Sequence, residues 1–303
     1  MPEADKYQPI KNWGMLLVLA LIWGSSFILI KKALLVFSAG EVGALRIVTA
    51  GTVLLPLAMP VLKDLRRKQL GYLLVIGFVG SFIPSFLFAT AQTNLSSSLA
   101  GVINALTPLM VVLVGGLFFQ ATITWKASLG LIIAFVGVGI LVLAGSETGV
   151  SFFSDLNLYG LFVVAATVCY GLNVNIIKYR VQEIRPKTIT AISLMMVLPL
   201  AALYLLAFTQ FSFKLLHVEG AWLAAGYISL LGIVGTAAAL ILFNTMVKLV
   251  TPVFASSVTY LVPLVAILWG VWDGERLFLL HYFGIVAVII GVWIGNRKSR
   301  LSK

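Results

Sequence analysis

The hydrophobic residues of this 303-residue sequence fall into separate apolar runs of roughly 20 residues, the length that a helix needs to cross the hydrocarbon core of a bilayer. Only 10% of the residues are charged, whereas an ordinary soluble domain has about 25%. A soluble globule of this composition would have to expose large apolar patches, which promote aggregation. The sequence therefore predicts an all-α integral membrane protein.

Ten runs are long enough to cross the membrane, and membrane helices tolerate the Gly and Pro residues inside them. We expect helices at 13–34, 42–62, 70–92, 99–119, 126–144, 156–178, 189–208, 221–247, 253–272 and 278–296. A polar tail at residues 1–12 precedes the first run, and a basic tail at residues 297–303 follows the last. The first run lacks a small-residue cleavage signal, so it predicts a membrane helix rather than a removable signal peptide.

Lys and Arg residues concentrate in alternate loops. Four of them lie at 63–68, between the second and third expected helices, and others follow helices four, six, eight and ten. The opposite loops hold most of the acidic residues, with Lys31, Lys32, Lys214 and Arg276 as exceptions. Because cytoplasmic loops are enriched in Lys and Arg, we expect a multi-pass protein of the cytoplasmic (inner) membrane with both termini in the cytoplasm.

The two halves of the sequence, 13–145 and 156–296, resemble each other at residues that shape the backbone. An identical residue stands 155 positions after each of Gly71, Gly77, Gly80, Pro108 and Gly115, and Gln120 aligns with Glu275. Trp23-Gly24 aligns with Tyr170-Gly171 at an offset of 147. Five helices per half is an odd number, so the sequence predicts ten transmembrane helices in two inverted five-helix repeats. Such repeats are typical of transporters that expose a central site to each side in turn.

Several short motifs resemble one family of transporters. They are residues 21–27 (Leu-Ile-Trp-Gly-Ser-Ser-Phe) with Lys31, residues 44–46 (Ala-Leu-Arg), 106–108 (Leu-Thr-Pro), 261–263 (Leu-Val-Pro) and 274–276 (Gly-Glu-Arg) with Gly284 and Gly291. On these residues nearly the whole chain is similar to EamA-type members of the drug/metabolite transporter superfamily. The resemblance implies two inverted five-helix repeats and the export or exchange of amino acids or other metabolites. Gln120 departs from the family, which often carries Glu at this position.

The midplane between the repeats is the expected place for a transported ligand. Polar, aromatic and proline residues of the expected helices one, four, six, eight and nine are our candidates there. The candidate substrate-binding residues are Trp23, Ser26, Asn104, Pro108, Tyr170, Asn173, Asn244, Thr259, Tyr260 and Pro263. Close packing of helices is the competing interpretation for the small and aromatic residues, and a simple kink is the competing interpretation for the two prolines.

Two basic residues, Lys31 and Arg46, are candidate gate residues that attract a carboxylate near the outer mouth of the pathway. In the competing interpretation, which their positions near helix ends favour, each charge extends to the membrane interface. For Arg46, an ion pair with Glu41 is the other structural explanation. All acidic residues are expected in tails, loops or helix ends, and buried relay groups are common in proton-coupled carriers. We therefore predict transport with weak or absent proton coupling.

Other classes of function lack support in the sequence. No residue cluster has the spacing of a metal site, so we expect neither a metal nor a cofactor, and no basic stripe indicates nucleic-acid binding. A small-molecule substrate and the lipid bilayer are the expected partners. A lipid flippase of the same architecture and, with less support, a membrane-embedded enzyme are the competing hypotheses. Small residues in helices five and ten indicate helix packing within the protomer or a homodimer contact.

Overall fold

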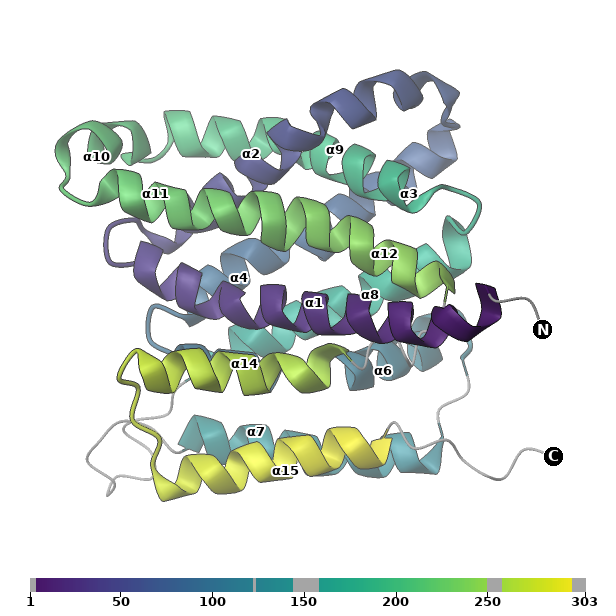
Figure 1. Cartoon of the computed structure of the whole chain (residues 1–303), viewed down its shortest axis with the longest axis vertical. Helices are drawn as coiled ribbons and strands as arrows, with labels where there is room; N and C mark the ends of the chain where they lie inside the picture. Colours follow the sequence, from purple (N-terminus) through teal and green to yellow (C-terminus); the bar gives the residue numbers. More distant parts are fainter. Residues whose placement is uncertain (1–3, 122–123, 144–157, 250–257, 296–303) are drawn as a thin grey trace.

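The computed structural model describes residues 4–121, 124–143, 158–249 and 258–295, and every regular element within these ranges is helical (Figure 1). Seven helical segments have the length and composition to cross a membrane. Three shorter apolar helices, Ser128–Leu141, Leu261–Trp272 and Leu279–Gly291, occupy the fifth, ninth and tenth predicted positions. The prediction of an all-α membrane protein with ten transmembrane helices is confirmed.

Several of the ten spans consist of more than one helical element. In order, they are α1 (Ala4–Ala33), α2 (Ala39–Ala58) with the 3₁₀ helix η1 (Met59–Asp64), α3 (Arg67–Gly77) with η2 (Phe78–Phe82) and α4 (Ile83–Ala91), α5 (Ser97–Asn104) with α6 (Thr107–Phe119), α7 (Trp125–Leu143), α8 (Gly160–Arg180), α9 (Pro186–Ala207), α11 (Ala221–Leu230) with η3 (Leu231–Ala238) and α12 (Ala239–Leu249), α14 (Val258–Trp272), and α15 (Leu279–Gly295). Two differences from the prediction stand out. Helix α1 begins at Ala4, so most of the predicted polar tail is helical, and a short helix, α10 (Phe211–His217), precedes α11.

The third and eighth spans contain π-helical segments, η2 and η3, which are common at functional sites. Shifted by the repeat offset of 155 residues, η2 falls on residues 233–237, inside η3. The two halves therefore share an irregularity as well as a sequence pattern. The fourth span is broken at Ala105 and Leu106, between α5 and α6. Pro108, just after this break, has no N–H group with which to continue the hydrogen bonding of α5.

Contacts between loops show that the halves are inverted. The end of α1 meets the loop after α14, where Lys31 Nζ lies 2.9 Å from Asp273 Oδ2. The loop after α8 lies at the opposite end of the bundle, where Glu183 accepts a hydrogen bond of 3.0 Å from Gln69 at the start of α3. We call these the Lys31 end and the Gln69 end. The equivalent helices α1 and α8 thus run in opposite directions, and the start of α1 and the end of α15 share the Gln69 end (Figure 1).

Helices α7 and α15 pack against each other at one edge of the bundle (Figure 1). A Cβ atom on Gly137 would lie 2.9 Å from the Gly284 carbonyl oxygen, and one on Gly291 would lie 2.6 Å from the Gly130 carbonyl oxygen. These contacts are closer than a side chain allows, so small residues are needed for the two helices to meet. Of the two predicted roles for this stripe, packing within the protomer is confirmed.

Candidate functional site

A cavity lies between the two halves, and its lining residues in the described chain come from seven of the ten spans, all except α7, α9 and α15. The cavity encloses about 980 Å³ of empty space, its opening included. Concave spaces with mostly apolar walls and a few polar groups are typical binding places for small molecules.

Most of the lining residues are related by the internal repeat. At the offset of 147 residues, Trp23, Ser26 and Phe27 match Tyr170, Asn173 and Val174, and at the offset of 155 residues, Gly80, Ser81, Phe88 and Asn104 match Gly235, Thr236, Phe243 and Thr259. Both members of each of these seven pairs line the cavity. The cavity therefore lies where the inverted halves meet, as transporter sites between repeats do.

Aromatic side chains from opposite halves form two walls of the cavity. The ring centroids of Trp23 and Phe243 are 5.2 Å apart, and those of Tyr170 and Phe88 are 6.1 Å apart. The repeat offsets relate the first pair to the second, because Trp23 matches Tyr170 and Phe243 matches Phe88. Each wall joins one half to the other, so a rotation of the halves against each other would separate these rings.

The π-helical segment η3 positions polar groups at the cavity. Trp23 Nε1 donates a hydrogen bond of 3.0 Å to the carbonyl oxygen of Gly235 in this segment. Gly232, one turn earlier, faces α2, where a Cβ atom would lie 2.7 Å from the Arg46 carbonyl oxygen and collide with the Thr49 hydroxyl. Glycine at this position therefore allows η3 to approach α2, which brings Thr236 within reach of Arg46.

Arg46 is the only charged residue among those that line the cavity in the described chain. Its Nε donates a hydrogen bond of 2.8 Å to Thr236 Oγ1, and its guanidinium interacts with the Tyr170 hydroxyl. Glu41 instead accepts a hydrogen bond of 2.7 Å from Lys214 Nζ and one from the Ser38 N–H at the start of α2. The proposed ion pair between Arg46 and Glu41 is therefore wrong, and the Arg46 side chain reaches the cavity rather than the membrane interface.

Two asparagines bring amide groups to the cavity from opposite sides. Asn104 ends α5, and its backbone carbonyl, which Pro108 cannot bond, accepts a hydrogen bond of 2.7 Å from Thr107 Oγ1. Asn173 is only 6% exposed, and its Oδ1 atom has no hydrogen-bond partner among the described residues. A buried polar atom without a partner is costly, so Asn173 carries an acceptor that the described residues leave unsatisfied.

The structure brings some of the predicted site residues together and leaves others apart. Trp23, Ser26, Arg46, Asn104, Tyr170, Asn173 and Thr259 line the cavity, and their role in binding stays a prediction. Pro108 and Pro263 are not among the lining residues, and neither are Asn244, which donates a hydrogen bond of 3.0 Å to Thr190 Oγ1, and Lys31. The Tyr260 side chain lies outside the described residues, although its backbone belongs to α14. Thr107 and Val111, rather than Pro108, continue the cavity-lining face that includes Asn104.

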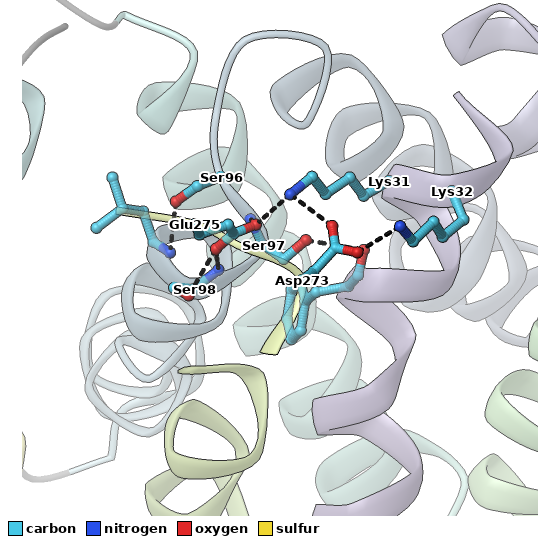
Figure 2. A network of polar contacts seen from close by, with 9 residues as sticks. Lys31, Lys32, Ser96, Ser97, Ser98, Asp273 and Glu275 are labelled. Atoms are coloured by element: carbon cyan, nitrogen blue, oxygen red, sulfur yellow. Dashed lines mark hydrogen bonds and ion pairs between the residues drawn. The ribbon is translucent and has the colours of Figure 1, made fainter. Parts of the chain in front are cut away.

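Lys31 belongs to a polar network at the Lys31 end of the bundle (Figure 2). Its Nζ atom lies 2.9 Å from Asp273 Oδ2 and 3.0 Å from Glu275 Oε1, and Lys32 forms a second ion pair with Asp273. On its other side, Glu275 accepts hydrogen bonds from the Ser97 N–H at 2.8 Å, the Ser98 N–H at 3.0 Å and Ser98 Oγ at 2.6 Å. Three spans thus meet at one carboxylate.

The charges of this network are stabilised by their surroundings. Burial alone would raise the pKa of Glu275, but hydrogen bonds from Ser98, Lys31 and the Ser97 N–H outweigh burial and hold this pKa below its usual value. Hydrogen bonds from Lys32 and Lys31 also lower the pKa of Asp273. Both carboxyl groups are therefore ionised at neutral pH. The start of α5 adds to this effect, because free N–H groups and the helix dipole favour an anion there.

Several lining residues were not among the predicted site residues, including Ser81, Phe88, Thr107, Thr236 and Phe243. The internal repeat contained the signal for most of them. Gly80-Ser81 and Gly235-Thr236 mark the repeat in the sequence, and both pairs lie in π-helical segments that line the cavity. Polarity and helical spacing alone could not reveal them, because a π-helical segment changes the face that each residue occupies.

The fold and the cavity define a multi-pass membrane protein of two repeats around a shared central space. The profile of the EamA-like transporter family matches residues 12–143 and 157–297, one match for each half. The chain belongs to this family, and the predicted membership is confirmed. It is therefore a membrane transporter rather than an enzyme.

Individual relatives are more distant. An uncharacterized transporter of Archaeoglobus fulgidus is 27% identical over 183 residues, which are 60% of this chain and 63% of that protein. An S-adenosylmethionine/S-adenosylhomocysteine transporter of Chlamydia trachomatis is 28% identical over 166 residues, 53% of this chain and 51% of the relative. The matched segments thus span about half to just under two thirds of these relatives. A crystal structure shares the fold with a TM-score of 0.61 at 18% identity, over 94% of this chain and 96% of the other.

Proposed function

We propose that this protein is a secondary transporter that moves small metabolites, amino acids or related compounds, by alternating access at the central cavity. The observation that supports this proposal is that seven repeat-related pairs of residues line the cavity. In an inverted repeat, exchanging the conformations of the two halves turns an opening toward one side into an opening toward the other. A site on the axis between the halves keeps its lining in both states.

The distribution of basic residues supports an orientation in the cytoplasmic membrane. The loops at the Gln69 end contain Lys63, Arg66, Arg185 and other basic residues, as cytoplasmic loops do. We place the Gln69 end and both termini in the cytoplasm, and the Lys31 end outside. In this orientation the network around Glu275 closes the outer side of the pathway.

The relatives support the class of substrate more than its identity. The relative from Chlamydia trachomatis is named for the transport of S-adenosylmethionine and S-adenosylhomocysteine, two amino-acid derivatives. A cavity with aromatic walls, two asparagines and one arginine suits molecules that combine apolar and polar groups. We propose export or exchange of such compounds.

Counterflow in proteoliposomes tests the proposal. Vesicles that contain the purified protein are loaded with unlabelled amino acids, and the uptake of labelled ones is measured. A saturable uptake that requires internal substrate supports a carrier, whereas uptake that never saturates indicates a channel. A lipid flippase would instead move fluorescent lipids between leaflets without any counterflow of amino acids, and that result would contradict the proposed substrate class.

Accessibility of the cavity tests the mechanism. The sequence has one cysteine, Cys169, so a Cys169→Ser background allows a single reporter cysteine at Ser81. A membrane-impermeant thiol reagent should react with this cysteine from either side of the membrane, and a transported ligand should slow both reactions. Reaction from one side only, under all substrate conditions, would contradict alternating access. A Thr93→Cys variant, in the loop between α4 and α5, controls for sided labelling of an exposed residue.

A further inference from the structure

We propose that Arg46 binds a carboxylate of the transported molecule inside the cavity, which defines the substrate as a small carboxylate-bearing metabolite. This inference rests on the proposed transport function. Arg46 lies eight residues after Ser38, the residue that caps α2, which places it about 12 Å along the helix axis. The guanidinium is therefore well inside the membrane span, where an ionisable side chain generally has a functional role.

The Arg46 guanidinium has N–H donors that no described residue uses. Nε is bonded to Thr236 Oγ1, and the guanidinium also interacts with the Tyr170 hydroxyl. An arginine has five N–H donors in a planar fork, so further donors on the two Nη groups remain for a ligand. Within the described chain, no carboxylate lies within 4.0 Å of Arg46, while the nearby Glu41 is paired with Lys214. A positive charge in this position lacks a permanent counter-ion, and a carboxylate fits its fork with two parallel hydrogen bonds.

The internal repeat shows that the scaffold does not require this charge. Helices α2 and α9 begin 147 residues apart, so Arg46 matches Ser193 of α9. Ser193 is buried, and its hydroxyl donates a hydrogen bond of 2.6 Å to the Ile189 carbonyl oxygen of its own helix. The equivalent position thus packs well without a charge. The arginine belongs to the chemistry of the cavity rather than to the architecture of the repeat.

A second group points to the rest of the ligand. Asn173 lies one turn from Tyr170 on α8, and residues three apart share a helix face. Tyr170 interacts with Arg46, so Asn173 borders the same part of the cavity. Its buried Oδ1 atom has no partner in the described chain and would accept a hydrogen bond from an ammonium or hydroxyl group. An amino acid supplies both a carboxylate for Arg46 and a donor for Asn173.

Matched ligands test the proposal. The purified protein is heated in detergent with each proteinogenic L-amino acid and, separately, with the amide of that amino acid, which lacks the carboxylate. A ligand that binds the folded state raises the Tm. We expect some acids but not their amides to raise the Tm of the unmodified protein, and Arg46→Gln to weaken that binding by about 100-fold, the order expected for the loss of charge-assisted hydrogen bonds. Arg46→Lys keeps the positive charge but lacks the planar guanidinium, so its ligand affinity should lie between those of the unmodified protein and Arg46→Gln.

The ligand-free Tm separates binding from structure. Arg46→Gln removes no ion pair and no longer buries an unpaired charge, which offsets the lost hydrogen bond to Thr236, so its ligand-free Tm should stay close to that of the unmodified protein. Lys214→Gln also removes one positive charge, but it breaks the pair with Glu41 and should lower the ligand-free Tm without changing ligand affinity. Equal binding of acids and amides, undiminished affinity in Arg46→Gln, or no binding of any acid would overturn the proposal. Saturable transport of an uncharged solute would in that case still support the carrier function.

A separate observation concerns the two ends of the pathway. At the Lys31 end, Glu275 joins α1 to α5 and to the loop after α14 (Figure 2). The repeat places Gln120 and Lys178 at the equivalent positions of the Gln69 end. The backbone conformation is the same at the two positions: the N–H groups of Glu275 and Gln120 each donate a hydrogen bond to the carbonyl oxygen of the residue five positions earlier. Stacked rings of Phe119 and Tyr179, 5.5 Å apart, hold the ends of α6 and α8 together.

We infer that this difference biases the resting transporter toward the state that is closed at the Lys31 end. The Lys31 end has an ion pair across the halves, whereas Lys178 has no carboxylate within 4.0 Å in the described chain. One ion pair at a partly exposed site contributes up to about 1 kcal/mol, which is roughly a five-fold change in an equilibrium. Gln120→Glu would provide the missing ion pair, and Glu275→Gln would remove the existing one.

The reporter cysteine at Ser81 measures this bias in oriented vesicles. Glu275→Gln should raise its labelling rate from the Lys31 side relative to the Gln69 side about five-fold. Gln120→Glu should shift the ratio in the same direction, and adding Lys178→Gln to Gln120→Glu should cancel that shift. An unchanged ratio in both single variants, or a shift that persists without Lys178, would overturn the inference. Counterflow by the same vesicles tests the carrier function independently of this ratio.

Discussion

Replacing Glu275 by glutamine should destabilise the protein more than removing the charge of its neighbour Asp273. The Glu275 side chain is 5% exposed and accepts four hydrogen bonds, from Lys31, the Ser97 N–H, the Ser98 N–H and Ser98 Oγ. Glutamine has nearly the same shape, but it carries no charge, and its NH₂ group cannot accept the bonds that one carboxylate oxygen accepts. The variant therefore leaves donors at the start of α5 without a partner.

The geometry sets the size of the effect. Breaking a buried ion pair from one side costs about 3–5 kcal/mol, but Lys31 is 34% exposed and regains water when the pair is lost. Two backbone donors at the start of α5 lose a charged acceptor, and hydrogen bonds to charged groups contribute about 1.5–3 kcal/mol each. Since glutamine keeps one acceptor oxygen, we expect a net loss of about 2–3 kcal/mol, or roughly 5 °C in Tm at the 2–4 °C per kcal/mol typical of chains somewhat smaller than this one.

Thermal unfolding in detergent, followed by intrinsic fluorescence, measures the loss. Asp273→Asn is the matched control, because Asp273 is more exposed, at 18%, and contacts only the two lysines among the described residues. We expect this control to lower the Tm by no more than about 2 °C, the effect of a surface ion pair. If both variants had the same Tm, the carboxylate at α5 would contribute no more than a surface charge, and our account of the network would be wrong.

Four further predictions follow from the same contacts. The pKa of Glu275 is lowered by folding, so its contribution is complete above the unfolded pKa of about 4.3 and is lost as the pH falls through the folded pKa; the Tm difference between the unmodified protein and Glu275→Gln should shrink below about pH 4. Trp23→Phe removes the hydrogen bond to η3 and should cost about 1 kcal/mol in thermal unfolding; an unchanged Tm would contradict that bond. Gly232→Ala adds a Cβ that collides with α2 and should lower both the Tm and the counterflow rate, whereas Gly226→Ala, where the space is open, should change neither. Transport of a neutral substrate in proteoliposomes should not follow an imposed pH gradient, and accumulation driven by such a gradient would refute the prediction of weak or absent proton coupling.

The sequence predicted the helices because the thickness of the bilayer fixes their length. It did not predict how deep within a span each residue lies. Arg46 illustrates this limit. The apolar run starts at Val42, which places Arg46 about one turn inside the helix, whereas α2 begins at Ala39 with Ser38 as its cap. The extra turn is formed by Ala39, Gly40 and Glu41, residues that hydropathy assigns to a loop. Because of this extra turn, Arg46 lies deeper in the span than predicted and reaches the cavity instead of the membrane interface.

Side-chain direction was predictable only where the helix is regular. Trp23 and Tyr170 lie mid-helix in α1 and α8 at matching repeat positions, and both line the cavity. Pro108 was assigned to the cavity from its spacing to Asn104, but Thr107 and Val111, three and seven residues after Asn104, line the cavity instead. Asn244 lies beyond the π-helical segment η3, which shifts the face on which later residues fall. Spacing along the sequence alone thus did not show which of these residues line the cavity.

The differences between the two halves have more consequence for function than the similarities. If the halves exchange conformations during transport, a residue pair that is identical in both stabilises the two end states equally and cancels from the equilibrium between them. Residues that differ between the halves stabilise the two end states unequally, so their contributions to this equilibrium remain. We infer that Glu275, where the other half has Gln120, favours one end state. Arg46, where the other half has Ser193, adds a charge to a cavity whose other described lining residues are neutral. We therefore expect the resting state and the specificity of the transporter to depend on the positions at which the two halves differ.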